Sequence, residues 1–334
     1  MTARHLLEVD DLWVSFATPR GTVHAVNGVG LTVREGETLG IVGESGSGKS
    51  VLARTVLGLT GRKGASVRGS IKVLGREVTT LSGRELLRFR GKTASMIFQD
   101  PMTSLNPVVR IGRQISEAIV QHLGCSRSEA NERTEQLLRE VGIPSPAKRM
   151  RQYPHQLSGG MRQRIVIAMA LACEPRLLLA DEPTTALDVT VQAQILELLE
   201  SEQQTRRMGM LLITHDFAVV ANRADRILVM YAGQVVEVAP TADLLDQPMM
   251  PYTAALLRSI PTLDQPIGSR LATIEGRPPM LYRRPAGCAF APRCPNAHDR
   301  CRQEAPPLRQ DTTNPDHHYR CWAPESTRLI VGAA

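Results

Sequence analysis

Short apolar runs alternate with longer amphipathic stretches along this chain, and most of the short runs end at a glycine or at polar residues. Residues 6–16 and 36–42 have the pattern of β-strands, and residues 50–59 continue as a helix after a glycine-rich turn. Residues 177–180 and 210–213 are short and wholly apolar, which is typical of parallel strands buried on both faces. The pattern therefore predicts an α/β domain.

The pattern changes in the middle of the chain and again near its last third. From about residue 101 to residue 170 it is helical and charged, as in the stretch SEANERTEQLLREVGI. Residues 227–231 and 234–238, joined through Gly233, then predict a β-hairpin. We expect a helical insertion in the α/β domain and a hairpin at its end.

Composition separates the end of the chain from the rest. Beyond residue 256 lie 11 of the 22 prolines, and 11 Arg against 7 Asp and Glu place +4 of the net charge of +7 there. We expect one domain over residues 1–255 and a small irregular lobe over residues 256–334. A basic surface can face nucleic acid or an anionic membrane. Aromatic residues make up only 4% of the chain, so base stacking gains little support.

The compartment follows from what the sequence does not contain. The N-terminal sequence MTARHLLEVDDLWVSF has no apolar core of the signal-peptide type. The longest apolar run, residues 165–173, is far shorter than the roughly 18 residues of a membrane span. We therefore expect a cytosolic chain whose thiols are reduced.

The first candidate for chemistry is the stretch GESGSGKS, which follows the second predicted strand and fits G-x-x-x-x-G-K-[ST]. Its glycines let backbone amides curl around phosphates, Lys49 reaches the β- and γ-phosphates, and the Ser50 hydroxyl can bind Mg²⁺. The helix that begins there points its positive end at the anion. The candidate phosphate loop consists of Gly43, Glu44, Ser45, Gly46, Ser47, Gly48, Lys49 and Ser50.

The second candidate is RLLLADEP, residues 176–183, an apolar strand that ends in two carboxylates. In P-loop enzymes the first of these, here Asp181, holds Mg²⁺ directly or through water. The second, Glu182, is placed to polarise an attacking water. Considered alone, such an acidic pair is as often a helix cap.

The third candidate is LSGGMRQR, residues 157–164. Ser158 can cap the helix that follows, and Gly159 and Gly160 leave backbone amides bare for an anion. The alternative is an ordinary N-cap before an apolar helix. In this sequence order, LSGGMRQR resembles the signature motif of ATP-binding cassette (ABC) ATPases.

The other motifs of that family have counterparts at the expected places. Gln99 in MIFQDPMTSLNP resembles the Q-loop glutamine, TALD with Asp188 resembles the D-loop, and His215 in ITHD resembles the switch histidine. Phe16 is our candidate for the aromatic residue that stacks on adenine. It precedes an insertion over residues 17–23, and core packing is the alternative for its side chain.

The resemblance implies a P-loop NTPase fold, in which a RecA-like core carries an antiparallel β subdomain and an inserted helical subdomain. It also implies a head-to-tail dimer, with ATP between the phosphate loop of one subunit and the signature of the other. Ser158 and Gly160 would therefore serve ATP bound mainly to the partner. Glu182 would activate water and His215 would hold the γ-phosphate. The residues expected around Mg²⁺ are Ser50, Gln99 and Asp181, and Gln99 would link that site to a membrane partner.

Four of the six cysteines lie near the end of the chain, spaced C-x5-C-x6-C-x19-C, and are Cys288, Cys294, Cys301 and Cys321. Disulfides are disfavoured in a reducing compartment. Four thiolates suit structural zinc, although the tight C-x2–4-C pairs of zinc motifs are absent. They also suit an iron–sulfur cluster, so the spacing leaves both open. A fifth, Cys173, lies in an apolar helical run and is expected to be inert core.

The segments PYTAALLRSIP, IEGRPP, GCAFAPRC and HHYRCW resemble the C-terminal extension of the ATPases of oligopeptide, dipeptide and nickel importers. One departure is QPMMPYT, where that family has His-Pro-Tyr-Thr. In that family these cysteines are associated with a [4Fe-4S] cluster, so the resemblance favours the cluster, with zinc as the alternative. We expect the cluster to cross-link the lobe, and His317 and His318 to lie on the lobe surface.

The resemblance as a whole implies an ATP-hydrolysing subunit that powers an ABC importer for peptides or a related small solute, on the cytoplasmic face of the membrane. Its partners would be two transmembrane permease subunits and a second ABC ATPase subunit, either a related chain or a second copy. An extracytoplasmic solute-binding protein would act indirectly, and no nucleic acid is expected. The alternative is a soluble ABC ATPase that acts on nucleic acid or ribosomes; a single cassette without long heptad runs favours the importer.

Overall fold

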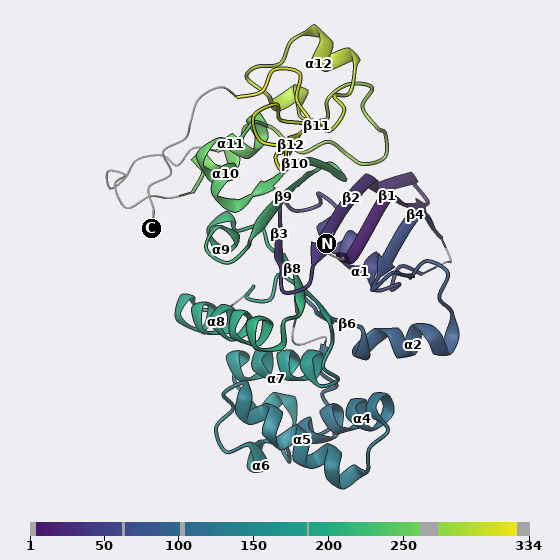
Figure 1. Cartoon of the computed structure of the whole chain (residues 1–334), viewed down its shortest axis with the longest axis vertical. Helices are drawn as coiled ribbons and strands as arrows, with labels where there is room; N and C mark the ends of the chain where they lie inside the picture. The colour runs from purple at the N-terminus through teal and green to yellow at the C-terminus, as the bar shows by residue number, and fades with distance from the viewer. Residues whose placement is uncertain (1–4, 62–63, 101–103, 186, 261–272, 326–334) are drawn as a thin grey trace. The chain divides into compact units, whose positions relative to one another are not determined.

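A computed structural model of the chain describes residues 5–61, 64–100, 104–185, 187–260 and 273–325 (Figure 1). The chain divides into two compact units. The first is built from residues 1–7, 33–37 and 72–211, and the second from residues 8–32, 38–71 and 212–334. Segments far apart in the sequence therefore build each unit.

The first unit is organised around two parallel strands, β6 (Ala94–Ile97) and β7 (Leu177–Asp181). Every residue of β7 is buried, as the wholly apolar run predicts. Helix α7 (Gly159–Leu171) contacts β6 and also the neighbouring helices α4 (Ile111–Leu123) and α5 (Arg127–Glu140), as the lower part of Figure 1 shows. Its other elements are β5 (Arg76–Glu77), α2 (Gly83–Lys92), α6 (Pro146–Arg149), the 3-10 helix η1 (Pro154–Gln156) and α8 (Val189–Arg206).

Local sequence signals set the ends of the helices in the inserted segment. Ser126 accepts a hydrogen bond from the Glu129 backbone and Glu129 bonds back to Ser126, a capping box that starts α5. Helix α4 ends at Gly124, which adopts a φ of 72°. The helical pattern expected over residues 101–170 is confirmed in the described part of that range, and residues 101–103 lie outside the described residues.

The second unit contains a sheet in which β3 (Thr38–Val42) runs parallel to β9 (Arg226–Tyr231). Strand β9 turns through Gly233 into antiparallel β10 (Gln234–Pro240), so the predicted hairpin is confirmed. Strand β8 (Gly209–Ile213), also predicted, begins in the first unit and ends in the second. The remaining helices before the C-terminal lobe are α1 (Lys49–Val56), α9 (Phe217–Ala221), α10 (Thr241–Asp246) and α11 (Pro251–Arg258).

A second sheet contains β1 (His5–Thr18), the first strand of the chain. In this sheet β1 lies between β2 (Gly21–Arg34) and β4 (Ala65–Val73). The stretch that we interpret from sequence as an insertion over residues 17–23 is a tight turn. The Thr18 hydroxyl donates to the Gly21 carbonyl over 2.7 Å, and β2 starts at once. The structure thus gives this stretch its shape, which the sequence alone does not define: a short turn that needs only a hydroxyl cap and one glycine at positive φ, here 122°.

The C-terminal lobe consists of short elements, and its innermost strand joins the sheet of the second unit. Strand β12 pairs antiparallel with β10, with Tyr319 opposite Glu237. The rings of Tyr231, Tyr252 and Phe290 form one cluster, with centroids 4.6 to 5.4 Å apart. The elements of the lobe are the 3-10 helix η2 (Ala291–Arg293), α12 (Asp299–Gln303), β11 (Arg309–Gln310) and β12 (His318–Tyr319). The lobe is irregular, as predicted.

One histidine of the lobe differs from the sequence-based expectation. His317, expected on the surface, is 3% exposed, and its Nε2 lies 2.7 Å from Oε1 of fully buried Glu237. Glu237 also accepts hydrogen bonds from the backbone amides of Met249 and Met250. The surface placement was wrong because a carboxylate 80 residues earlier in the chain provides a buried partner.

Candidate nucleotide site and cysteine cavity

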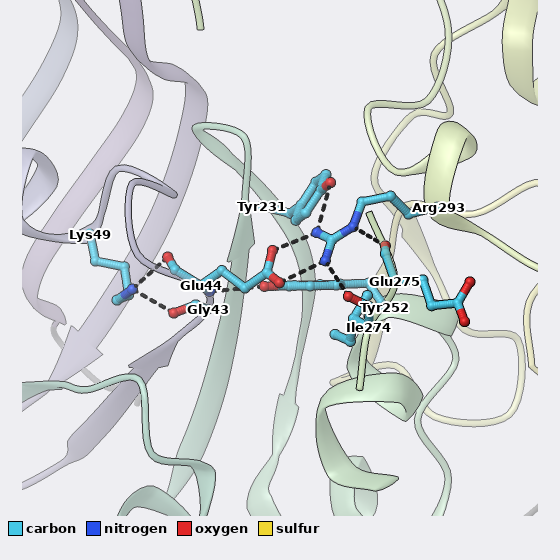
Figure 2. Close-up of polar contacts among 8 residues, drawn as sticks. All are labelled: Gly43, Glu44, Lys49, Tyr231, Tyr252, Ile274, Glu275 and Arg293. Carbon is cyan, nitrogen blue, oxygen red and sulfur yellow. Dashed lines mark hydrogen bonds and ion pairs between the residues drawn. The ribbon is translucent and has the colours of Figure 1, made fainter. Parts of the chain in front are cut away.

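The phosphate loop connects β3 to α1 in the second unit, as its sequence pattern predicts. The Lys49 side chain folds back over the loop, where Nζ donates to the carbonyls of Gly43 over 2.6 Å and Glu44 over 3.0 Å (Figure 2). Lys49 and Ser47 are both buried. The loop thus has the ammonium group of Lys49 at its centre, and α1 begins directly after the last loop glycine, Gly48.

Two glycines of this loop are needed for close approach of the backbone to its neighbours. A Cβ at Gly43 would lie 2.2 Å from the Met230 carbonyl oxygen, and one at Gly48 would lie 2.3 Å from the Ala25 carbonyl oxygen. Both glycines also adopt positive φ, 149° and 104°. Gly46, by contrast, has open space where its Cβ would be. The turn therefore requires the glycine spacing that the motif specifies.

The two carboxylates at the end of β7 have different surroundings in the first unit. Asp181 is 1% exposed, whereas Glu182 is half-buried and adopts a φ of 48°. Glu182 Oε2 accepts hydrogen bonds from Gln99 Nε2 over 2.8 Å and from the Thr185 hydroxyl over 2.9 Å. Two residues of the predicted site, Gln99 and Glu182, are thus brought together. A left-handed backbone at a non-glycine residue is a strained conformation that is concentrated at functional sites.

The signature motif starts α7. Ser158 is its N-cap and accepts a hydrogen bond from the Met161 amide over 3.3 Å, so the predicted cap is confirmed. A Cβ at Gly160 would lie 2.9 Å from the Val191 side chain, whereas one at Gly159 would only touch Leu187 at 4.0 Å. Gly160 is therefore needed for packing against α8.

Sequence reasoning missed a side chain that links the signature helix to the acidic pair. Gln163 is 2% exposed, and its Nε2 donates to the Pro183 carbonyl over 2.5 Å. Pro183 directly follows Glu182, so one hydrogen bond connects α7 to the loop that carries this carboxylate. The sequence carries little signal for it, because Gln163 stands between Arg162 and Arg164, and only the fold shows that it is buried and requires a polar partner.

The other predicted residues fall on element ends. Asp188 caps α8 by accepting from the Val191 amide over 2.9 Å, and Ala186 of the same TALD motif lies outside the described residues. His215 is exposed and follows β8 by two residues. Phe16 is half-buried near the end of β1. Each unit thus carries a subset: the phosphate loop, Phe16 and His215 belong to the second unit, and the other predicted nucleotide-site residues to the first.

The four clustered cysteines all line one small cavity in the second unit, and all carry free thiols. Burial raises the pKa of Cys288 and Cys294, and it raises the pKa of Cys321 to about 12. Backbone hydrogen bonds to the sulfurs oppose this effect: they come from Phe290 and Ala291 for Cys288, from Asn296 for Cys294 and from Ala323 for Cys321.

The cavity is lined by the donor set of a four-thiolate group, but its present dimensions are small. Its accessible volume is about 10 Å³, which is roughly enough room for one water molecule. Among the described residues, no three His, Cys, Asp or Glu side chains are grouped closely enough to hold a metal ion. The donor chemistry therefore suits four-thiolate ligation, but in the present arrangement the thiols are not grouped closely enough to bind one metal ion together.

Cys173, in contrast, is buried in the first unit just after α7. Burial raises the pKa of its thiol to about 11. A protonated, buried thiol is chemically inert, which agrees with the core role expected for it.

A glycine loop between a strand and a helix, with a lysine folded over it, defines a P-loop nucleotide-binding protein. The family model described as "ABC transporter" matches residues 26–185, and the one described as "Oligopeptide/dipeptide transporter, C-terminal region" matches residues 236–301. Both matches cover candidate sites: the first covers the phosphate loop, Gln99, the signature motif and the acidic pair, and the second covers three of the four clustered cysteines.

Whole-chain relatives agree with these matches. The chain is 51% identical over 322 residues to the oligopeptide transport ATP-binding protein OppD of Salmonella typhimurium, covering 96% of this chain and 95% of that protein. It is 49% identical to the dipeptide transport ATP-binding protein DppD of Bacillus subtilis, covering 95% and 94%. This chain therefore belongs to the oligopeptide/dipeptide family of ABC transporter ATPases.

Solved structures support the same fold for the nucleotide-binding part. A dimeric structure of MJ0796, a bacterial ABC transporter cassette, matches with a TM-score of 0.63 at 26% identity, covering 70% of this chain and 98% of that one. The same cassette in a post-hydrolysis state bound to ADP and phosphate matches equally well. In the described part of the chain, none of the helices combines the length and apolar composition needed to cross a bilayer.

Proposed function

We propose that this chain is the ATP-hydrolysing subunit that powers an ABC importer for peptides or a related small solute. The observation that carries the proposal is the phosphate loop with Lys49 folded over it, in a chain that resembles peptide-transport ATPases over nearly its full length. The relatives reported above are named as transport proteins, so nothing favours the alternative of a soluble ABC ATPase that acts on nucleic acid or ribosomes.

In the second unit, the loop amides and Lys49 would bind the phosphates of ATP, and Ser50 at the start of α1 would hold Mg²⁺. The lysine is already oriented by the loop carbonyls, so little rearrangement is needed to exchange these partners for phosphate oxygens. We assign Phe16 to the adenine and His215 to the γ-phosphate and the attacking water. The half-buried position of Phe16 and the exposed position of His215 are compatible with ligand contact.

In the first unit, we assign Asp181 and Gln99 to the Mg²⁺ environment and Glu182 to the activation of water. The contact between Gln99 and Glu182 supports this grouping, because the side chain that would sense Mg²⁺ already touches the proposed base. Phosphoryl transfer requires mainly positioning and charge stabilisation. A carboxylate held by two hydrogen bonds meets the positioning requirement.

The assembly that we propose contains two ATPase subunits in head-to-tail contact, the second being a related chain or another copy of this one. Ser158, Gly159 and Gly160 would then face ATP bound by the partner, and Asp188 would approach the same interface. Support comes from the dimeric cassette with which this fold matches. At the cytoplasmic face of the membrane, the conformational change of the ATPase subunits would be transmitted to two transmembrane permease subunits. An extracytoplasmic protein would deliver the solute.

We extend the proposal to the domain organisation and to the cysteine cavity. The nucleotide-binding domain would occupy residues 1–255 and the C-terminal lobe residues 256–334. The cysteines would hold a [4Fe-4S] cluster, with zinc as the alternative; when bound, either group supplies a covalent cross-link to the lobe. Four thiols around one cavity, with backbone amides donating to three of the sulfurs, support ligation.

The metal content decides between the two groups. The chain should be purified without oxygen and assayed for iron, acid-labile sulfide and zinc per chain. We expect about four irons with matching sulfide. Zinc without sulfide would establish the alternative, and the absence of all three would remove the cross-link while leaving the ATPase proposal standing.

The ATPase proposal is tested by Glu182→Gln in the assembled transporter. The amide keeps the size of the side chain but cannot act as a base, so ATP turnover should fall by at least about a hundredfold while ATP binding persists. A change of a surface acid of the first unit that lies in an ordinary ion pair, Glu135→Gln, serves as the control. Near-normal turnover of Glu182→Gln would contradict the assignment of the base.

A further inference from the structure

One arginine of the C-terminal lobe makes a direct ion pair with the phosphate loop. Arg293 Nη1 lies 2.6 Å from Glu44 Oε2, and Nη2 lies 2.8 Å from Glu44 Oε1, which is a bidentate arrangement (Figure 2). Glu44 is the second residue of the loop, and 249 residues separate the two partners. The contact lies within the second unit.

The guanidinium is held in place by other parts of the same unit. Its Nε donates to the Glu275 carbonyl over 2.8 Å, and Nη2 donates to the Ile274 carbonyl over 3.1 Å. Nη1 also lies 3.3 Å from the Tyr231 hydroxyl. The Arg293 side chain is only 4% exposed, against 25% for Glu44. All three nitrogens thus have partners, which a lysine with its single ammonium cannot reproduce.

The opposite side of Glu44 belongs to the nucleotide site. The Glu44 carbonyl accepts from Lys49, and its amide donates to the Tyr252 hydroxyl over 2.9 Å. Figure 2 shows Lys49 on one side of the Gly43–Glu44 segment and Arg293 on the other. The segment is therefore fixed at the carbonyl by the loop lysine, at the amide by Tyr252 and at the carboxylate by Arg293.

The charge of Glu44 makes this arrangement important for an anionic ligand. A carboxylate beside a phosphate-binding loop disfavours phosphate, and the effect grows when the carboxylate is partly buried and uncompensated. Arg293 compensates that charge, and Glu44 in turn raises the pKa of Arg293 above its ordinary value, so the guanidinium stays charged. The ion pair leaves the loop with the net positive charge of Lys49.

We propose that Arg293 is a positioning residue for the phosphate loop, which binds the Glu44 carboxylate, neutralises it and fixes the Gly43–Glu44 segment for ATP. The C-terminal lobe then contributes to the nucleotide site, although none of its residues belongs to the nucleotide motifs. Arg293 ends the 3-10 helix η2 and directly precedes Cys294 of the cysteine cavity. The inference rests on the proposed function, since it assigns the loop to ATP.

The test is the affinity of the full chain for Mg²⁺ with the non-hydrolysable analogue AMP-PNP, measured by equilibrium titration. We expect Arg293→Met to weaken binding about tenfold, the effect of about 1.4 kcal/mol, because Glu44 is left uncompensated. Arg293→Lys keeps the charge but loses the bidentate geometry, so its affinity for the analogue should lie between those of the wild-type chain and Arg293→Met. Arg258→Met removes a different ion pair of the same unit, with Glu325, and should leave the affinity within about twofold.

A double variant separates positioning from a general effect on folding. Glu44→Gln removes the carboxylate, so in the Arg293→Met background it should restore most of the lost affinity, to within about threefold of the wild-type chain. A merely structural arginine would not be rescued by a change in the loop. In the assembled transporter, Arg293→Met should raise the KM for ATP while kcat stays within about twofold.

The outcomes are distinct. Binding of the analogue by Arg293→Met within twofold of wild type, or losses that multiply in the double variant, would overturn the inference. If Arg293→Met fails to fold, the comparison of Arg293→Lys with the pair Glu44→Gln and Glu44→Gln/Arg293→Lys decides by the same criterion. A wild-type chain that does not bind the analogue would instead refute the proposed function.

Discussion

At the scale of single residues, Glu182 is a closely constrained side chain of the first unit, because its carboxylate is held by Gln99 and Thr185 on a backbone at positive φ. Each hydrogen bond restricts where the carboxylate points. A base that is displaced by a fraction of an ångström loses much of its effect, because catalysis of phosphoryl transfer depends on position. The two hydrogen bonds therefore have separate, measurable consequences for turnover.

We predict that Thr185→Val lowers ATP turnover in the assembled transporter about tenfold, the effect of losing one hydrogen bond to a charged group. ATP affinity should stay unchanged, because Thr185 contacts the base. Thr79→Val is the matched control: its hydroxyl donates to the Glu77 carboxylate over 2.6 Å, in a part of the first unit outside the nucleotide motifs. Equal losses of turnover in the two variants would contradict the positioning role of Thr185.

At the scale of elements, the helix that begins at the signature motif starts at a serine that caps it and that we also assign to the partner's ATP. Ser158 caps α7 with an acceptor distance of 3.3 Å to the Met161 amide. Ser126 caps α5 over the same distance, 3.3 Å, to the Glu129 amide. The two side-chain hydrogen bonds are alike in length, although Ser126 also belongs to a capping box, and only Ser158 belongs to a motif assigned to ATP. This similarity provides a comparison within one chain.

We predict that Ser158→Ala and Ser126→Ala each lower the free energy of unfolding by about 1 kcal/mol, the usual value of an N-cap. Only Ser158→Ala should also lower ATP turnover of the assembled transporter, since its hydroxyl would face the partner's nucleotide. Denaturant titration of the free chain and steady-state turnover of the complex check the two parts. A Ser158→Ala complex with the turnover of Ser126→Ala would leave only the capping role.

The elements also show what sequence could and could not predict. The strand before the phosphate loop, β7, β8 and the β9–β10 hairpin were predictable because each is a local run with its own turn residue. Helix α1 ends at Val56, three residues before the expected end, because Gly58 adopts a φ of 61°. Strand β2 was not predicted, and only its first residues fall within the stretch interpreted as an insertion, residues 17–23.

For the site, whether a contact could be predicted from sequence depends on how far apart its two residues lie along the chain. The phosphate loop and the cap at Ser158 were predictable because each lies within one short segment. The contact between Arg293 and Glu44 spans 249 residues, and the one between His317 and Glu237 spans 80. Neither Arg293 nor His317 lies in a sequence motif that indicates its partner, so these contacts can be recognised only in the folded chain.

At the scale of the whole molecule, contacts other than the proposed cysteine cross-link hold the C-terminal lobe to its unit. Strand β12 continues the sheet beside β10, Phe290 packs on Tyr231, and Arg293 binds the phosphate loop. A lobe of short elements buries little apolar area by itself, so these contacts determine whether it stays folded. Its stability should therefore depend on polar contacts with the body of the second unit.

The buried contact between His317 and Glu237 provides the sharpest test of this dependence. Glu237 is fully buried, and within the described residues removal of the imidazole leaves its carboxylate with the amides of Met249 and Met250 as donors. We predict that His317→Ala lowers the free energy of unfolding by about 3 kcal/mol, and that hydrogen exchange quickens at β12 and β10 together. His318→Ala, at the half-buried neighbouring position, should have a much smaller effect. Faster exchange at β12 alone would mean that the lobe detaches as a separate unit, whereas joint exchange would mean that it unfolds with the sheet to which it is paired.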